Sequence, residues 1–173
     1  MPKEIQKDIS NIDLYFIDNL EIVLKNSKLL STRQYIVHGN TSCLLHSIAV
    51  AYYSYKVAKY LNIISFNEKA LIRGALLHDY YLYDWHIKDS SHRLHGFFHP
   101  GKALKNAESD FSLSDIEKDI IKKHMFPLTL SPPRYRESTL VCMVDKVCSL
   151  YETFKIGNYD KLKSRIQLNS LIK

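Results

Sequence analysis

Four histidines and two aspartates are the residues of this chain whose types and order could do chemistry together. His78 and Asp79 are adjacent, and the other candidates are His46, His99, His124 and Asp145. Neighbouring residues of a helix point about 100° apart, so an adjacent His-Asp pair can approach one ion from two directions. Imidazoles combined with carboxylates suit Fe, Mn, Zn or Ni, whereas Mg and Ca prefer oxygen alone. The set therefore indicates a transition-metal site.

Helix-start signals precede the first of these residues. Thr41 or Ser42 can cap a helix whose apolar face contains His46. A capping box over residues 65–68 predicts another helix, which ends on a buried pair that begins with His78. Both candidates are thus expected on the core side of their helices.

The remaining candidates fall in three later segments. Pro100 suits the first helical position, which predicts His99 at the N-terminus of a short helix. The capping box Ser114-x-x-Glu117 opens a helix that presents His124, and a last clear helix over about 136–154 carries Asp145 on an apolar stripe. A single His on an apolar face is usually a hydrogen-bonded core residue. Several buried His and Asp side chains need compensating partners, and one shared metal site would compensate all of them.

Length and composition predict an all-α, single-domain protein. The 173 residues, 46% of them apolar, are enough for one sizeable core, and few Gly or Pro interrupt the helical spacing of apolar positions. Three parts are expected along the chain. Residues 1–34 form an N-terminal covering helix, 35–155 the domain core, and 156–173 a basic C-terminal extension.

Charge and hydropathy limit the partners and the location. The net charge of +6 is spread along the chain, so no nucleic-acid polymer is expected as a partner. Apolar stretches are too short for a membrane span, and the first residues lack the apolar core of a signal peptide. The three cysteines show no metal-knuckle spacing. We therefore expect a cytoplasmic protein without membrane contact, and a homodimer stays open.

The order of these motifs resembles that of a known superfamily. His46, His78-Asp79 and Asp145 resemble the H…HD…D pattern of the HD superfamily of metal-dependent phosphohydrolases, over roughly residues 35–152. The superfamily has an HD-type helical bundle, which the resemblance implies here.

Two further histidines refine the resemblance. His99 and His124 are similar to the extra histidines of the binuclear branch, which includes the HD-GYP cyclic-di-GMP phosphodiesterases and the HD-type diadenosine tetraphosphate hydrolases. Tyr83 stands where the family often has a phosphate-binding lysine, and no Gly-Tyr-Pro follows His124.

The resemblance implies two divalent transition-metal ions, Fe or Mn first and Zn or Ni as alternatives. One ion would be held by His46, His78, Asp79 and Asp145, and the other by Asp79, His99 and His124. Asp79 would bridge them and, with His78, form the catalytic pair. The implied reaction is attack of a metal-activated water on a small phosphoester, a nucleotide or a related phosphate, without a covalent intermediate.

Basic and aromatic residues near the motifs are candidates for binding the small phosphorylated substrate. Residues 80–98 form a segment rich in aromatics and histidine, which predicts a loop folded over the site. The substrate-binding candidates are Lys102, Lys123, Arg136 and Lys146 for phosphate, and His86 and His95 for the pocket wall.

Two other functions remain open beside the phosphohydrolase. Some HD-fold proteins use a di-iron site with a similar ligand set to oxidise a C–H bond, and a third reading is a non-catalytic ligand-binding module that retains the metals. Metal identity and oxygen dependence separate the first two, and turnover of a phosphoester separates the third.

Overall fold

The computed structural model describes residues 11–61, 64–84, 95–154 and 159–171. Within these ranges the fold is a single helical domain, as the composition predicted, with one short antiparallel hairpin of β1 (Ile36–His38) and β2 (Thr41–Ser42). The helices are α1 (Asn11–Lys25), the 3-10 helix η1 (Leu29–Gln34), α2 (Cys43–Tyr60), α3 (Glu68–Leu77), α4 (His95–Asp110), α5 (Asp115–Lys123), α6 (Arg136–Thr153), α7 (Asp160–Arg165) and α8 (Leu168–Leu171).

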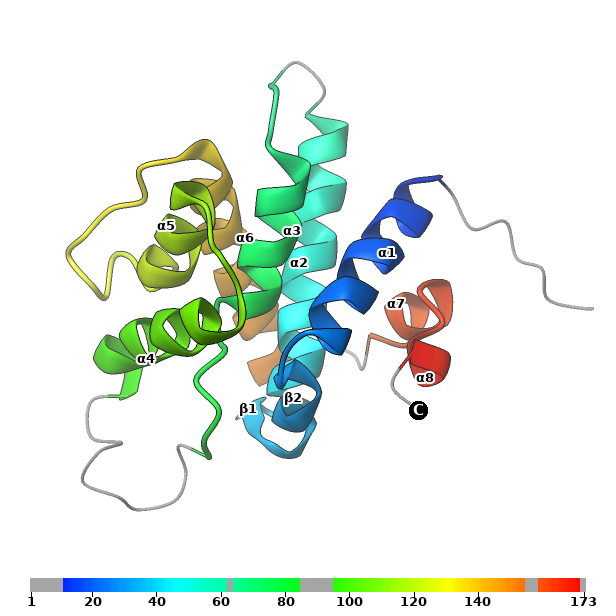
Figure 1. Cartoon of the computed structure of the whole chain (residues 1–173). Helices are drawn as coiled ribbons and strands as arrows, with labels where there is room; N and C mark the ends of the chain where they lie inside the picture. The colour runs from blue at the N-terminus through cyan, green and yellow to red at the C-terminus, as the bar shows by residue number, and fades with distance from the viewer. Residues whose placement is uncertain (1–10, 62–63, 85–94, 155–158, 172–173) are drawn as a thin grey trace, which may run out of the picture.

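Helices α2 and α3 lie side by side at the centre of the molecule (Figure 1). Helix α6 packs against α2, α5 packs against both α3 and α6, and α4 packs against α5. Helix α1 covers α3 on the other side, with α7 and α8 beyond it (Figure 1). This arrangement brings the start of α2, the ends of α3 and α5, and the middle of α6 to one region.

The helix starts agree with the sequence signals in two cases and differ in one. Ser42 caps α2, and Ser114 forms the expected capping box with Glu117 at α5. The capping box predicted from Ser65 is wrong, because Asn67 is the N-cap of α3. Asn is as strong a cap as Ser and directly precedes the helix, so the nearer residue takes the position.

Helix α4 begins earlier than predicted. It starts at His95, so His99 lies in its second turn and not at its N-terminus, and Pro100 lies inside the helix. Proline lacks the N–H that would donate to the carbonyl four residues earlier, and its ring crowds that carbonyl, so α4 loses stability there. Ala103 and Ala107 of α4 are fully buried, and this packing outweighs the loss.

The C-terminal residues also belong to the core. Leu162, Ile166 and Leu168 are buried with the residues of α1 and α2, and Arg165 pairs with the buried Asp13 at 3.5 Å. None of the helices in the described part of the chain is long and apolar enough to cross a bilayer.

Candidate metal centre

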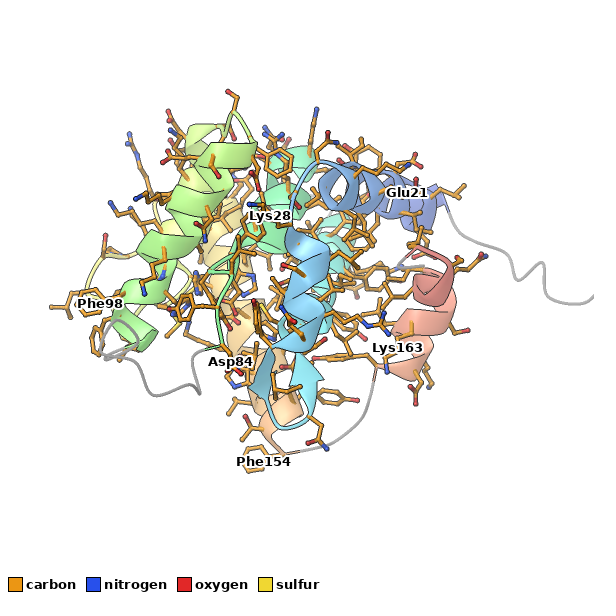
Figure 2. The ribbon with its side chains drawn as sticks, turned by 60° about the horizontal axis from the view of Figure 1, so that its bottom comes forward. Glu21, Lys28, Asp84, Phe98, Phe154 and Lys163 are labelled. Atoms are coloured by element: carbon orange, nitrogen blue, oxygen red, sulfur yellow. The ribbon has the colours of Figure 1, made fainter. Side chains whose placement is uncertain are left out.

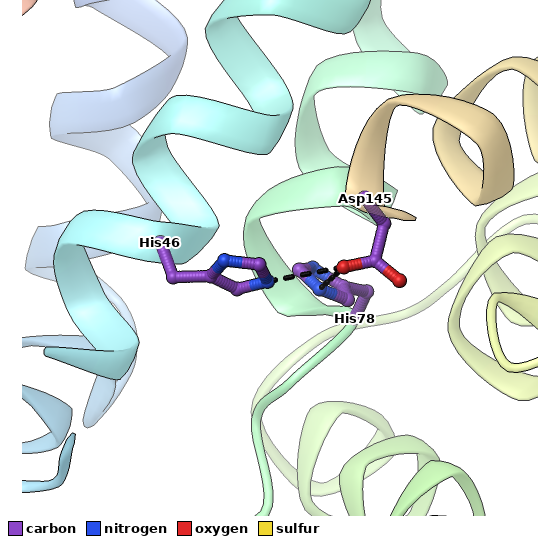
Figure 3. A group of neighbouring side chains, drawn as sticks. All are labelled: His46, His78 and Asp145. Atoms are coloured by element: carbon purple, nitrogen blue, oxygen red, sulfur yellow. Dashed lines mark hydrogen bonds and ion pairs between the residues drawn. The ribbon is translucent and has the colours of Figure 1, made fainter. Parts of the chain in front are cut away.

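The six candidate ligands come together in one buried cluster. None of their side chains belongs to a residue more than 6% exposed. Two groups of donor atoms each lie within 4.8 Å of one another. The first group contains His46, His78 and Asp145, whose side chains point toward a common centre in Figure 3, and the second contains His78, Asp79 and His124.

His78 and His124 are presented by the same local device. Each is the residue that ends its helix, α3 or α5, and each donates its Nδ1–H to the carbonyl three residues earlier, at 2.7 Å to Ala75 and 2.9 Å to Ile121. These carbonyls belong to the last turn, where no intrahelical partner exists. The bond fixes the tautomer, so the Nε2 of each neutral ring carries a lone pair. The negative ends of two helix dipoles also face the cluster and favour a cation there.

Close packing of α3 on α5 sets the distance between these two rings. A Cβ on Gly74 would lie 2.7 Å from Cδ1 of Ile120, so only glycine allows this approach without displacement. The ion pair of Arg73 with Glu117 joins the same two helices. The helix ends therefore meet, and the ring centroids of His78 and His124 lie 4.8 Å apart.

The helix that carries His99 is held to the segment that follows Asp79. The side-chain amide of Asn106 donates to the carbonyl of Tyr80 at 2.9 Å, and the Tyr80 hydroxyl donates to Asp110 at 2.6 Å. These bonds position α4 so that His99 Nε2 lies 3.2 Å from Asp79 Oδ1.

The two carboxylate oxygens of Asp79 face two different pairs of imidazoles. Oδ2 lies 3.8 Å from His46 Nε2 and 3.6 Å from His78 Nε2. Oδ1 lies 3.2 Å from His99 Nε2 and 3.5 Å from His124 Nε2. This is the arrangement expected of a carboxylate that bridges two ions.

The donor set fits metal ions because several of its nitrogen and oxygen atoms face another lone pair and not a hydrogen-bond donor. Among the described residues, His78 Nε2 and Asp79 Oδ1 have no hydrogen-bond partner although both are buried. The Nε2 atoms of His99 and His124 lie 2.8 Å apart. Lone pairs at such distances repel unless a proton or a cation lies beside them, and an unsatisfied buried polar atom costs about 1–3 kcal/mol. Cations within this cluster would satisfy these atoms together.

A carboxylate absent from the sequence predictions holds His46. Glu152 accepts from His46 Nδ1 at 2.9 Å, and His46 Nε2 lies 3.1 Å from Asp145 Oδ1. The hydroxyl of Tyr159 donates to Glu152 at 2.8 Å. Metal-ligating histidines usually donate their other ring N–H to such a group. The only sequence signal for Glu152 was its place seven residues after Asp145 on the same stripe, and nothing pointed to Tyr159.

Charges within the cluster shift the pKa values of its members in opposite directions. Burial alone would lower the pKa of His46, but hydrogen bonds to Asp145 and Glu152 outweigh it and raise this pKa well above its usual range. Burial would raise the pKa of Asp79, but His78 and the other nearby imidazoles hold it well below its usual range. In the metal-free cluster the carboxylates therefore favour protonation of His46, and metal binding at its Nε2 should release that proton.

The contact with Glu152 leads to a testable prediction about metal affinity. The change Glu152→Gln keeps the size of the side chain but removes the charge that orients His46 and raises its basicity. We expect metal affinity to fall about 10- to 100-fold, measured by competition with a chelator of known affinity. Glu137→Gln is the matched control, because Glu137 is equally buried on α6 but accepts from Asn67 N. Unchanged affinity in the Glu152 variant would exclude the orienting role.

The hairpin brings one more histidine to the edge of the cluster. The His38 ring lies 5.5 Å from the His46 ring, edge to face, and burial lowers the His38 pKa. No sequence signal marked this position, because a strand of three residues is too short to show a periodic pattern.

Among the predicted basic residues, Lys102 is linked to the ligands through two tyrosine rings. Its ammonium is 4.4 Å from the centre of the Tyr83 ring, which contacts Tyr81, and Tyr81 contacts His99. Lys102 follows His99 by nearly one turn of α4. Its aromatic neighbours thus link it to the second ligand group.

The other predicted basic residues each have a partner within the chain. Lys123 forms an ion pair with Asp119 at 2.8 Å, and Arg136 donates to a backbone carbonyl ahead of α3 at 2.9 Å. The Lys146 ammonium donates to the carbonyl of His124 at 2.9 Å. Lys146 therefore supports a ligand-bearing turn, whereas nothing in the geometry connects Arg136 to the cluster.

Two predicted pocket residues lie outside what the structure describes. His86 falls in the range 85–94, and the side chain of His95 is not described although its backbone begins α4. Their role in substrate binding stays a prediction.

Because no family model, curated protein or solved structure matches this chain, the functional assignment rests on the geometry of the cluster. What the structure establishes is a buried His/Asp cluster, in an all-helical domain, that could hold metal ions.

Proposed function

We propose that this protein is a metal-dependent phosphohydrolase of the HD superfamily that hydrolyses a small phosphoester, a nucleotide or a related phosphate, at a two-metal site. The observation that carries the proposal is Asp79, whose two oxygens face separate pairs of imidazoles. The order of the ligands along the chain supports the same superfamily.

Each side chain of the cluster has a defined part in this proposal. Divalent ions, when bound, supply an activated water and offset charge on the phosphoryl oxygens. His78 and His124 present fixed Nε2 lone pairs because backbone carbonyls hold their other nitrogen. Asp79 and Asp145 are each 6% exposed, whereas His46 and His78 are fully buried.

The state of the nearest thiols favours water as the nucleophile. The Cys43 thiol donates to the carbonyl of Asp79 at 3.4 Å, and burial raises its pKa far above its usual range. Burial also raises the pKa of Cys148 to about 11. Both remain protonated near neutral pH, and a protonated thiol is a poor nucleophile.

Lys102 is the residue we propose to contact the phosphate. Its ammonium lies over Tyr83, the residue that stands in place of the lysine common in the superfamily. The charge would thus come from α4 and not from the segment after the His-Asp pair.

Substitution of a ligand of the second group tests whether the second metal ion acts in the chemical step or in substrate binding. His124→Ala should reduce the bound metal from two ions to one. The rate constant kcat should fall by roughly 100-fold or more, with a smaller change in KM, because the lost charge acts mainly in the transition state. Metal content and steady-state kinetics check this. Lys122→Ala, an exposed position on the same helix, is the control. A large rise in KM with kcat unchanged would assign His124 to substrate binding.

The proposed reaction is tested with a substrate panel. Protein purified without chelator and reloaded with Mn or Fe should release product from at least one member of a set of phosphomonoesters, cyclic nucleotides and dinucleoside polyphosphates. Oxygen consumption by the Fe form without any phosphoester turnover would replace the proposal with an oxygenase. Bound metal without either activity would indicate a ligand-binding module.

A further inference from the structure

Helix α6 carries an apolar stripe on the side opposite its metal ligand. Met143, Val147, Leu150 and Phe154 are 56%, 65%, 59% and 71% exposed, respectively. Their spacing of four, three and four residues places all of them within about 60° of one another around the helix, and Asp145 on the opposite side. Figure 2 shows Phe154 projecting away from the ribbon at the end of this helix.

The second half of α2 continues this apolar surface. Tyr53, Val57 and Tyr60 follow one another at the same helical spacing and are all exposed by more than a third. A groove of about 540 Å³ runs between α2 and α6. Its walls include Tyr53 and Val57 from α2, and Leu140, Val144, Val147 and Tyr151 from α6.

The area of this surface distinguishes an ordinary apolar patch from a protein–protein interface. Taken with typical whole-residue areas, the exposed fractions of the residues on the α6 stripe and on α2 correspond to roughly 800 Å², backbone and tyrosine hydroxyls included. The largest apolar patch of a typical monomer is about 300–600 Å². A standard protein interface buries about 800 Å² on each partner. The surface therefore has the size of one side of a stable interface.

We propose that the face formed by α2 and α6 binds a second copy of this chain, so that two α2–α6 pairs pack as a four-helix interface. The face is self-complementary, because each copy presents both a ridge, the α6 stripe, and an apolar groove beside it. A two-fold axis would place the ridge of each copy against the groove of the other. The alternation of three- and four-residue steps is the spacing that such bundles use.

The charged residues at the edge of the face are compatible with this packing. Lys59 pairs with Glu68 at 2.8 Å, and Arg136 donates to the carbonyl of Ser65 at 2.9 Å. Lys59 thus has a carboxylate partner within its own chain, so association need not bury its charge unpaired. This interface uses different residues from the metal cluster, and it does not depend on the proposed reaction.

The oligomeric state of the full chain tests the proposal. Analytical ultracentrifugation of the wild-type protein at micromolar concentration should give twice the monomer mass of 20.2 kDa. Val147→Glu should give the monomer mass, because the Kd of dimerisation should rise at least 100-fold. Leu150→Lys provides an independent second variant. Ile22→Glu and Leu130→Glu are controls, because both replace exposed apolar residues outside α2 and α6. Circular dichroism and metal content confirm that each variant is folded.

Three outcomes would overturn the proposal. One is a wild-type protein that stays monomeric at high concentration. Another is a dimer that both α6 variants leave intact. The last is a monomer that dimerises only after deletion of residues 2–10, which would mean that the chain covers its own face. Loss of dimerisation without loss of metal would support the interface alone.

Discussion

The change Asp79→Asn is expected to remove both bound metal ions and to abolish catalysis. Asparagine keeps the shape of the side chain but loses the negative charge that faces four imidazoles, two from each oxygen. Loss of an outer-shell partner alone weakens metal binding 10- to 100-fold, so loss of the shared ligand should exceed roughly 100-fold at both positions. Elemental analysis after gel filtration measures the metal content.

Asp119→Asn is the matched control for this change. Asp119 is as buried as Asp79, but it pairs with Lys123 and accepts from the backbone N–H of Arg134. That variant should keep its metal even if it loses some stability. A full metal complement in the Asp79 variant would exclude the bridging role. Loss of one ion only would assign Asp79 to a single position.

Removal of the metal should destabilise the fold by several kcal/mol. The ligands come from α2, α4 and α6 and from the ends of α3 and α5, so bound ions join elements that are far apart in the sequence. At a free metal concentration 1,000 times Kd, each independent ion stabilises the native state by about 4 kcal/mol. For a domain of this size, 4 kcal/mol corresponds to a Tm shift of roughly 8–16 °C.

Thermal unfolding with and without chelator measures this shift. The Tm should recover when Mn or Fe is added back. The Asp79→Asn variant is the control, because chelator should leave its Tm unchanged. If verified removal of metal leaves the wild-type Tm unchanged as well, the cluster does not hold structural metal and the ligand assignment is wrong.

The sequence by itself determined the helical class and the residues of the cluster. Apolar spacing, Ser42 and Ser114 are local signals, and a helix responds to local signals because its hydrogen bonds are local. The His-Asp pair ended its helix as predicted. Burial of His and Asp on apolar faces required a common partner, and the six side chains do converge. The division of the ligands between two ions stays a prediction.

Tertiary structure decided how the cluster is oriented and which charges reach it. Glu152 holds His46 across more than 100 residues, and Tyr159 holds Glu152 from beyond α6. Lys123 and Arg136 are near motifs in the sequence but are engaged with partners elsewhere. A long side chain pairs with groups that are close to it in three dimensions, and closeness in the sequence does not indicate which groups those are. Helical periodicity likewise shows which apolar residues share a helix face, but not whether another element covers that face. The exposed face of α2 and α6 could therefore be identified only from the packed helices.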